Sequence, residues 1–126
     1  MSQRIPRVLV VEDDPQVREA IQWALEEEGL AVTTASGGRE ALDAASSQPP
    51  DLVLLDLTLP EMNGYEVASS LRSTSEHELP ILLMTADGQA PRKAEMVGAY
   101  AFLRKPFEVG TLIELVRRGL HDRGSA

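Results

Sequence analysis

Short apolar runs recur along the chain, and a polar residue with a reactive side chain stands at or near the end of each. The runs are Val8–Val11, Leu52–Leu55, Ile81–Met84 and Ala101–Leu103. Fully apolar runs of this length are typical of strands that are buried on both faces of a parallel sheet. The pattern therefore predicts a sheet whose strands lead into functional groups.

Amphipathic helical patterns separate the runs, as they do in chains built from βα units. Asp14 can cap the first helix, Pro15 suits its first turn, and Gly29 fits the position just past its end. Trp23 lies off the apolar stripe of this helix, and we expect it to pack at the edge rather than to contact a partner. The other expected elements are a strand at about Val32–Ala35 and helices that end at about Ser46, Arg72, Val97 and His121. The alternation predicts an α/β fold with a doubly wound, five-stranded parallel sheet in a three-layer sandwich, as one domain over residues 1–126 with its core at about 7–120.

The polar residues at the ends of the runs are expected to lie together. Glu12 and Asp13 follow the first run, Asp56 follows the second, Thr85 follows the third, and Lys105 comes shortly after the last. Ligands of open α/β sheets bind at the carboxyl ends of the strands. Carboxylates gathered there repel one another unless a cation neutralises them, and Mg²⁺ prefers such oxygen ligands.

Each of these residues also has an ordinary structural explanation. Acidic residues are common at a helix N-terminus, and Asp56 could begin the turn-rich segment that follows it. A buried carboxylate without a partner is costly, however, and Lys105 and Thr85 would add an ammonium and a hydroxyl at the same edge. Carboxylates, a hydroxyl and a lysine together indicate phosphoryl transfer, with one carboxylate as the nucleophile.

Composition and charge exclude several other classes of protein. The chain has no cysteine, which excludes disulfides and thiolate metal sites and favours a cytoplasmic location. No apolar stretch approaches the length of a membrane span, and the net charge of −8 disfavours binding to nucleic acid. Residues 1–91 carry a net charge of −11, whereas residues 92–126 carry +3. Such an asymmetry often marks an interaction surface, and a solvated surface with charges clustered by chance is the alternative explanation.

Five short motifs, taken together with their order and spacing, resemble the receiver domain of bacterial response regulators. The resemblance extends from about residue 7 to about residue 120. The motifs are Val11–Pro15, Leu54–Leu57, Pro60–Gly64, Met84–Ala86 and Lys105–Phe107. The resemblance implies a flavodoxin-like fold and a signalling domain of a two-component or phosphorelay system rather than an enzyme. Its phosphodonor would be a sensor histidine kinase or a histidine phosphotransfer protein. With no linker or DNA-binding pattern behind the domain, we expect a single-domain regulator.

The resemblance assigns roles to the acidic residues. Asp56 would be the phosphoacceptor, and Asp13 would bind Mg²⁺ directly. Glu12 would bind the ion through water, with the backbone carbonyl of Thr58 as a further ligand. The predicted cofactor is therefore Mg²⁺ alone.

The resemblance also predicts how the signal leaves the site. Lys105 would pair with the phosphoryl group, and Thr85 would donate a hydrogen bond to it after transfer. Phe102 falls where the family carries an aromatic ring whose rotamer follows Thr85, although the residues alone leave open that it is an ordinary core aromatic. The Lys105–Pro106 bond is often cis in relatives.

The predicted output face lies in the basic C-terminal part of the chain. In the family this face is formed by the fourth helix, the fifth strand and the fifth helix. Here the segment before Gly98 is short, and Ala101 stands where relatives often carry Asp. We therefore expect a short fourth helix, a monomer or weak dimer, and a downstream protein partner with an acidic surface. The candidate residues of this output face are Arg92, Lys93, Arg104, Arg117 and Arg118.

Two other function classes remain open from the residues alone. An Asp-nucleophile phosphatase would carry a second Asp two residues after the nucleophile, where this chain has Thr58. A flavodoxin-like cofactor binder would offer hydroxyls and glycines to a phosphate in its first loop, whereas Glu12 and Asp13 would repel one.

Overall fold

Strands and helices alternate throughout the residues that the computed structural model describes, which are 4–57, 63–75, 78–86, 88 and 90–124. The strands are β1 (Arg7–Val11), β2 (Ala31–Ala35), β3 (Leu52–Asp56), β4 (Ile81–Thr85) and β5 (Ala101–Arg104). The helices are α1 (Pro15–Glu27), α2 (Gly38–Ser47), α3 (Gly64–Thr74), α4 (Ala90–Val97) and α5 (Val109–Gly124). These bounds lie within a few residues of those expected from the sequence, and α4 is short, as predicted.

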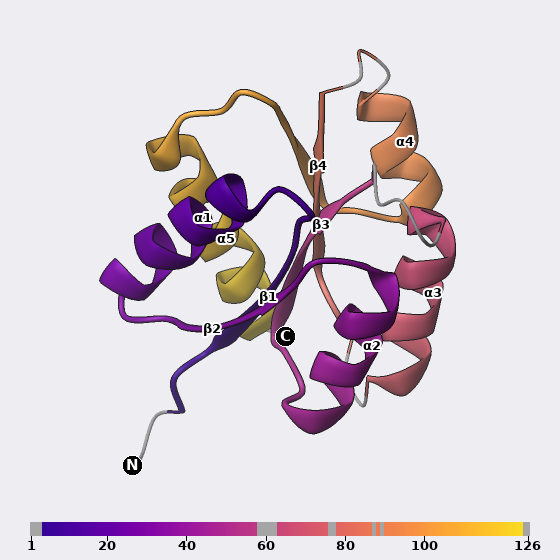
Figure 1. Ribbon diagram of the computed structural model, residues 1–126, viewed down its shortest axis with the longest axis horizontal. Coiled ribbons are helices and arrows are strands. Elements are labelled where there is room, and N and C mark those ends of the chain that lie inside the picture. The colour runs from indigo at the N-terminus through magenta and orange to yellow at the C-terminus, as the bar shows by residue number, and fades with distance from the viewer. Residues whose placement is uncertain (1–3, 58–62, 76–77, 87, 89, 125–126) are drawn as a thin grey trace.

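All the strands belong to one parallel sheet, in the order β2-β1-β3-β4-β5 (Figure 1). The chain first moves outward from β1 to β2 and then returns past β1 to β3. The direction of winding therefore reverses between β1 and β3, and this reversal opens a crevice at their carboxyl ends. The doubly wound α/β fold is confirmed.

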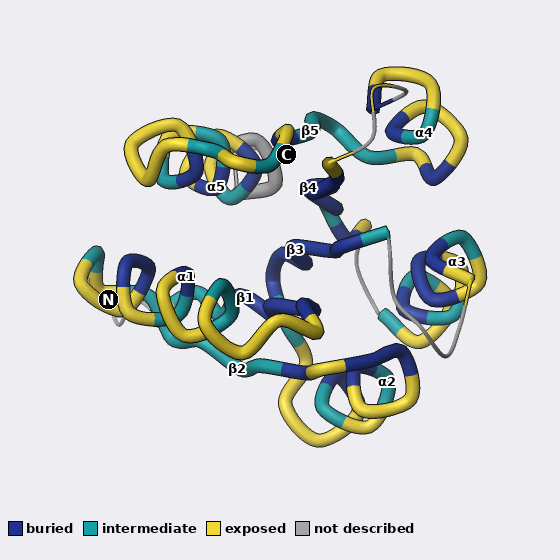
Figure 2. Tube along the Cα trace, turned by 45° about the horizontal axis from the view of Figure 1, so that its top comes forward, coloured by how far each residue is buried: buried dark blue, intermediate teal, exposed yellow. Residues whose placement is uncertain are grey.

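Two hydrophobic cores lie on the two faces of the sheet. Figure 2 shows α1 and α5 on one face and α2, α3 and α4 on the other, each with its exposed side turned outward. Side chains that alternate along a strand reach opposite faces. In β3, for example, Leu52 and Leu54 pack against α1 and α5, whereas Val53 and Leu55 pack against the other three helices. No helix in the described part of the chain is both long and apolar enough to cross a membrane.

The last helix is held close to the sheet by a tyrosine and a glycine. The hydroxyl of Tyr100 donates a hydrogen bond to the backbone carbonyl of Leu115, at 2.7 Å. A Cβ at Gly119 would lie 2.5 Å from that hydroxyl oxygen and 2.6 Å from Leu52 Cδ1. The glycine therefore permits a close approach that a larger residue would prevent.

Replacing Gly119 with Ala is expected to destabilise the protein by about 1–3 kcal/mol, because the added methyl group overpacks the contact between α5 and Tyr100. Gly110, in the first turn of the same helix, has open space where its Cβ would stand. Gly110→Ala should leave stability unchanged or raise it by up to about 1 kcal/mol. Urea denaturation measures both values. Equal effects of the two substitutions would contradict the close packing at Gly119.

Candidate functional site

The carboxyl ends of β1 and β3 bring two buried carboxylates together. Val11 of β1 pairs with Leu55 of β3, so the residues that follow them, Glu12 and Asp56, stand side by side. Both are 0% exposed. By strand alternation both side chains belong to the face that α1 and α5 cover. The candidate site therefore opens toward those two helices.

Lys105 places its ammonium between the two carboxylates. Its Nζ lies 2.5 Å from Glu12 Oε1 and 3.1 Å from Asp56 Oδ2. The peptide bond between Lys105 and Pro106 is cis, as in the resemblance drawn from the sequence. One ammonium group therefore forms ion pairs with both carboxylates.

The charges of the site shift its pKa values in the directions that burial and pairing dictate. Burial raises the pKa of Glu12 above its ordinary value, although the hydrogen bonds from Lys105 and from the Asp14 amide act against this. Burial would lower the pKa of Lys105, but its hydrogen bonds with Glu12 and Asp56 and their negative charges together raise it. Lys105 is therefore a firmly charged ammonium.

The loop between β1 and α1 is fixed by its own polar groups. The Asp14 side chain accepts hydrogen bonds from the amides of Gln16 and Val17, and so caps α1 as predicted. The Asp14 amide donates to Glu12 Oε2 at 3.1 Å. Glu12 is thus held from both sides, by this amide and by Lys105.

Three carboxylates of the site could hold a metal ion. One oxygen from each of Glu12, Asp13 and Asp56 lies within 4.8 Å of the other two, and Asp13 is the exposed member of the set. Such a set fits Mg²⁺, a hard cation that takes oxygen ligands from a few carboxylates and keeps several waters. Thr58, whose backbone carbonyl was expected as a further ligand, lies outside the described residues.

The structure places Thr85 and Phe102 on the other face of the sheet. Thr85 is 0% exposed and continues the side of β4 that packs against α2, α3 and α4. Phe102 is half-buried against the same core, beside Leu83 in the register of β4 and β5. The guanidinium of Arg104 lies 5.8 Å from the centre of its ring. Thr85 therefore links the carboxyl ends of the strands to the face of the sheet that carries α4, where Phe102 also lies.

The expected output face divides into two groups of residues. Arg92 of α4 and Arg104 of β5 are exposed, and Lys93 is half-buried. On α5, Arg118 lies 3.5 Å from Glu114 of the same helix. Arg117 pairs with Glu28, just after α1, and therefore lies toward α1 rather than toward α4.

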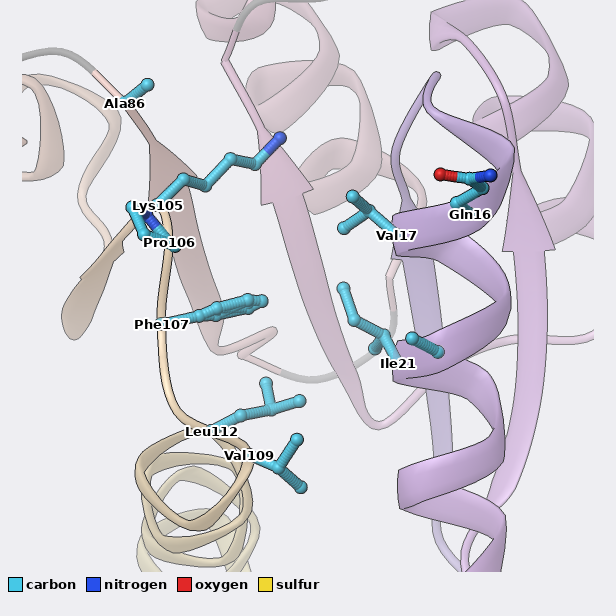
Figure 3. A pocket seen from close by; sticks show the side chains of 10 residues that line it. Gln16, Val17, Ile21, Ala86, Lys105, Pro106, Phe107, Val109 and Leu112 are labelled. Carbon is cyan, nitrogen blue, oxygen red and sulfur yellow. The ribbon is translucent and has the colours of Figure 1, made fainter.

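An apolar pocket opens beside the carboxylates on the α1 and α5 side. Its volume is about 560 Å³. In Figure 3, Phe107 and Leu112 face Val17 and Ile21 of α1 across the hollow, and Lys105 stands at its upper end. The other residues that line it are Gln16, Ala20, Ala86, Pro106 and Val109.

Two large apolar side chains are exposed on the elements that form this pocket. Val109, which lines it, is 54% exposed, and Trp23 of α1 is 69% exposed. The edge packing expected for Trp23 is therefore wrong. The sequence did not reveal the pocket, because its two walls come from opposite ends of the chain and neither shows an unusual pattern.

Comparisons with known proteins agree on one family. The family model described as "Response regulator receiver domain" matches residues 8–117. The chain is 43% identical to Response regulator MprA of Mycolicibacterium vanbaalenii over 94% of its own length. That match covers 54% of MprA, so the chain spans about half the length of this curated relative.

Solved structures of similar proteins share the fold. The chemotaxis response regulator CheY4 of Vibrio cholerae has a TM-score of 0.83 and 34% identity, with 93% of this chain and all of CheY4 covered. The response regulator TrrA of Thermotoga maritima, crystallised in complex with Mg²⁺ and BeF, has a TM-score of 0.81 and 35% identity. That match covers 92% of this chain and 100% of TrrA.

Proposed function

The chain belongs to the response regulator receiver domains, and from this premise we propose that Asp56 is the residue on which it accepts a phosphoryl group. The family is one of phosphoacceptor signalling domains, which decides against the phosphatase and the flavodoxin-like cofactor binder considered from the sequence. The observation that carries the proposal is the burial of Asp56 against a lysine and a second carboxylate. Asp56 therefore has the surroundings of a reactive group rather than of a surface charge.

The proposed reaction needs one bond to form and one to break. A carboxylate oxygen of Asp56 attacks the phosphorus atom of a phosphohistidine, forming an O–P bond as the N–P bond breaks. The imidazole nitrogen leaves with the electron pair of that bond. Lys105, whose Nζ lies 3.1 Å from Asp56 Oδ2, is placed to pair with the negative oxygens of the incoming group.

We assign Glu12, Asp13 and Asp56 to a Mg²⁺ site, with Asp13 as the direct ligand and Glu12 acting through water. The ion would supply positive charge where the phosphoryl oxygens arrive. The relative TrrA was crystallised in complex with Mg²⁺ and BeF, which supports this assignment. The carbonyl of Thr58 stays a prediction, as does a cytoplasmic location.

Incubation with acetyl phosphate tests the proposal directly. In the presence of Mg²⁺ the intact mass of the chain should rise by one phosphoryl group, and without a divalent cation it should not. A chain that stays unmodified with Mg²⁺ present would contradict the proposed function.

The apolar pocket is the proposed contact for the phosphodonor. A donor must bring its phosphohistidine to Asp56, and Lys105 belongs both to the acceptor site and to the pocket wall. Val109 lines the pocket and is exposed, and α1, which forms one wall of the pocket, carries a second exposed apolar side chain, Trp23. Buried apolar anchors with a charged group at their edge are typical of protein contacts. We therefore propose that a sensor histidine kinase or histidine phosphotransfer protein docks there.

Val109→Glu is expected to slow phosphotransfer from a donor kinase by about tenfold, because it places a charge in the apolar contact. Labelling by acetyl phosphate, which needs no docking, should keep its wild-type rate. Met96 of α4 is also exposed, at 61%, and Met96→Glu is the matched control. Equal kinase rates for the two variants would place the docking surface elsewhere.

The output face is proposed to consist of Arg92, Lys93 and Arg104, near α4 and β5. Complementary charge raises the association rate and selects partners, so this face suits a protein partner with an acidic surface. Arg117 and Arg118, also expected here, already pair with Glu28 and Glu114. Charge reversal at those two positions would disturb existing ion pairs, and reversal at Arg104 would disturb its contact with Phe102, so Arg92 is the better position for such a test. A monomer or weak dimer and a single-domain regulator stay predictions.

A further inference from the structure

An arginine of α1 contacts the backbone of the loop that follows β1 and carries Glu12 and Asp13. Arg18 Nη1 donates a hydrogen bond to the carbonyl oxygen of Glu12 at 2.9 Å and lies 3.5 Å from the carbonyl oxygen of Asp13. Arg18 is half-buried. It therefore contacts the main chain of the two residues whose carboxylates, with that of Asp56, form the candidate metal site.

The position of Arg18 is a poor one for the helix that carries it. It is the fourth residue of α1, close to the positive end of the helix dipole, where a cation is unfavourable. Asp14 and Pro15 already supply the cap and the first residue of this helix. A contribution to helix stability therefore does not explain an arginine here, whereas its contact with the loop does.

We propose that Arg18 is a positioning residue of the metal site, which holds the Glu12–Asp13 backbone so that the carboxylates are in place before Mg²⁺ binds. The inference rests on the proposed function, because it takes the carboxylate cluster to be the Mg²⁺ site. Three crowded negative charges favour a loop that relaxes and separates them. A loop held in place avoids the ordering cost at the moment of binding.

Two effects of Arg18 on Mg²⁺ affinity have opposite signs. Its positive charge repels the ion, so loss of the charge alone would tighten binding. Its hydrogen bonds hold the loop, so their loss would weaken binding. Groups that orient metal ligands typically change metal affinity by about 10–100-fold when they are removed. The direction of the change therefore tells which effect dominates.

Calorimetric titration with MgCl₂ of the wild type and three variants makes this test. Arg18→Gln should weaken Mg²⁺ binding about tenfold. Arg18→Lys keeps the charge, but its ammonium ends one bond short of the Nη1 atom that contacts both carbonyls, so it should also weaken binding, by a smaller factor. Arg118→Gln, which removes the same charge from an exposed position on α5, should match the wild type.

Hydrogen exchange of the metal-free proteins provides a second measurement. The amides of residues 12–14 should exchange faster in Arg18→Gln than in the wild type and in Arg118→Gln, with α1 retained in the far-UV circular dichroism spectrum. Equal or tighter Mg²⁺ binding by Arg18→Gln, or wild-type binding by Arg18→Lys, would overturn the positioning role. A wild-type chain that binds no Mg²⁺ would instead overturn the proposed metal site itself.

Discussion

Replacing Asp56 with Asn is expected to abolish phosphorylation, both by a donor kinase and by acetyl phosphate with Mg²⁺. The amide lacks the anionic oxygen that attacks phosphorus, and it removes one of the three carboxylates proposed to hold the metal. We expect a loss of at least about a thousandfold in labelling rate, since removal of a nucleophile costs on the order of 10³ or more. Intact mass over time measures it.

The Asp56→Asn variant should remain folded. The substitution keeps the shape of the side chain and removes one of several crowded negative charges, while Lys105 still pairs with Glu12. Asp43 is an exposed aspartate on α2, and Asp43→Asn is the matched control that should label like the wild type. If the Asp56→Asn chain gains a phosphoryl group at the wild-type rate, the nucleophile has been wrongly assigned.

Replacing Thr85 with Ala is expected to leave phosphorylation intact but to abolish the change in partner affinity that phosphorylation causes. Thr85 ends β4 on the face that carries Phe102 and α4, whereas Asp56 and Lys105 lie on the other side. The hydroxyl is proposed to move toward the phosphoryl group and bias the loop that leads into α4. The variant should therefore accept the phosphoryl group at nearly the wild-type rate and fail to report it.

The effect is measured as the ratio of partner affinities with and without phosphorylation. Couplings between sites are typically about 5–150-fold, and Thr85→Ala should reduce this ratio to near one. Thr85→Ser keeps a hydroxyl and should keep most of the ratio. An unchanged ratio in Thr85→Ala would show that the signal leaves the site by another route.

Much of this site follows from the sequence because the ends of the strands are marked by apolar runs that stop at polar residues, whereas the structure supplies the order of the strands. Apolar runs locate β1 and β3, and parallel strands place their carboxyl ends at one edge. Glu12, Asp56 and Lys105 therefore come together without any knowledge of side-chain conformation. The cap at Asp14 and the short α4 follow equally from local residue chemistry.

The parts that the sequence did not predict depend on long side chains that reach across the fold. Arg18 can extend in many directions, and only the structure shows its guanidinium on the loop carbonyls of Glu12 and Asp13. A cation near the start of a helix was the available signal. Arg117 likewise reads as an exposed charge, but Glu28 lies within reach only because α1 and α5 share a face of the sheet.

The position of the phosphoryl group tests the proposed phosphoacceptor most directly. The wild-type chain is incubated with acetyl phosphate and Mg²⁺, digested, and its peptides are fragmented in a mass spectrometer. We predict a single phosphoryl group, on Asp56, that is absent when a chelator removes the divalent cation. A phosphoryl group on any other residue, or labelling of Asp56 that persists in the chelator, would contradict the proposed role of Asp56 and its metal site.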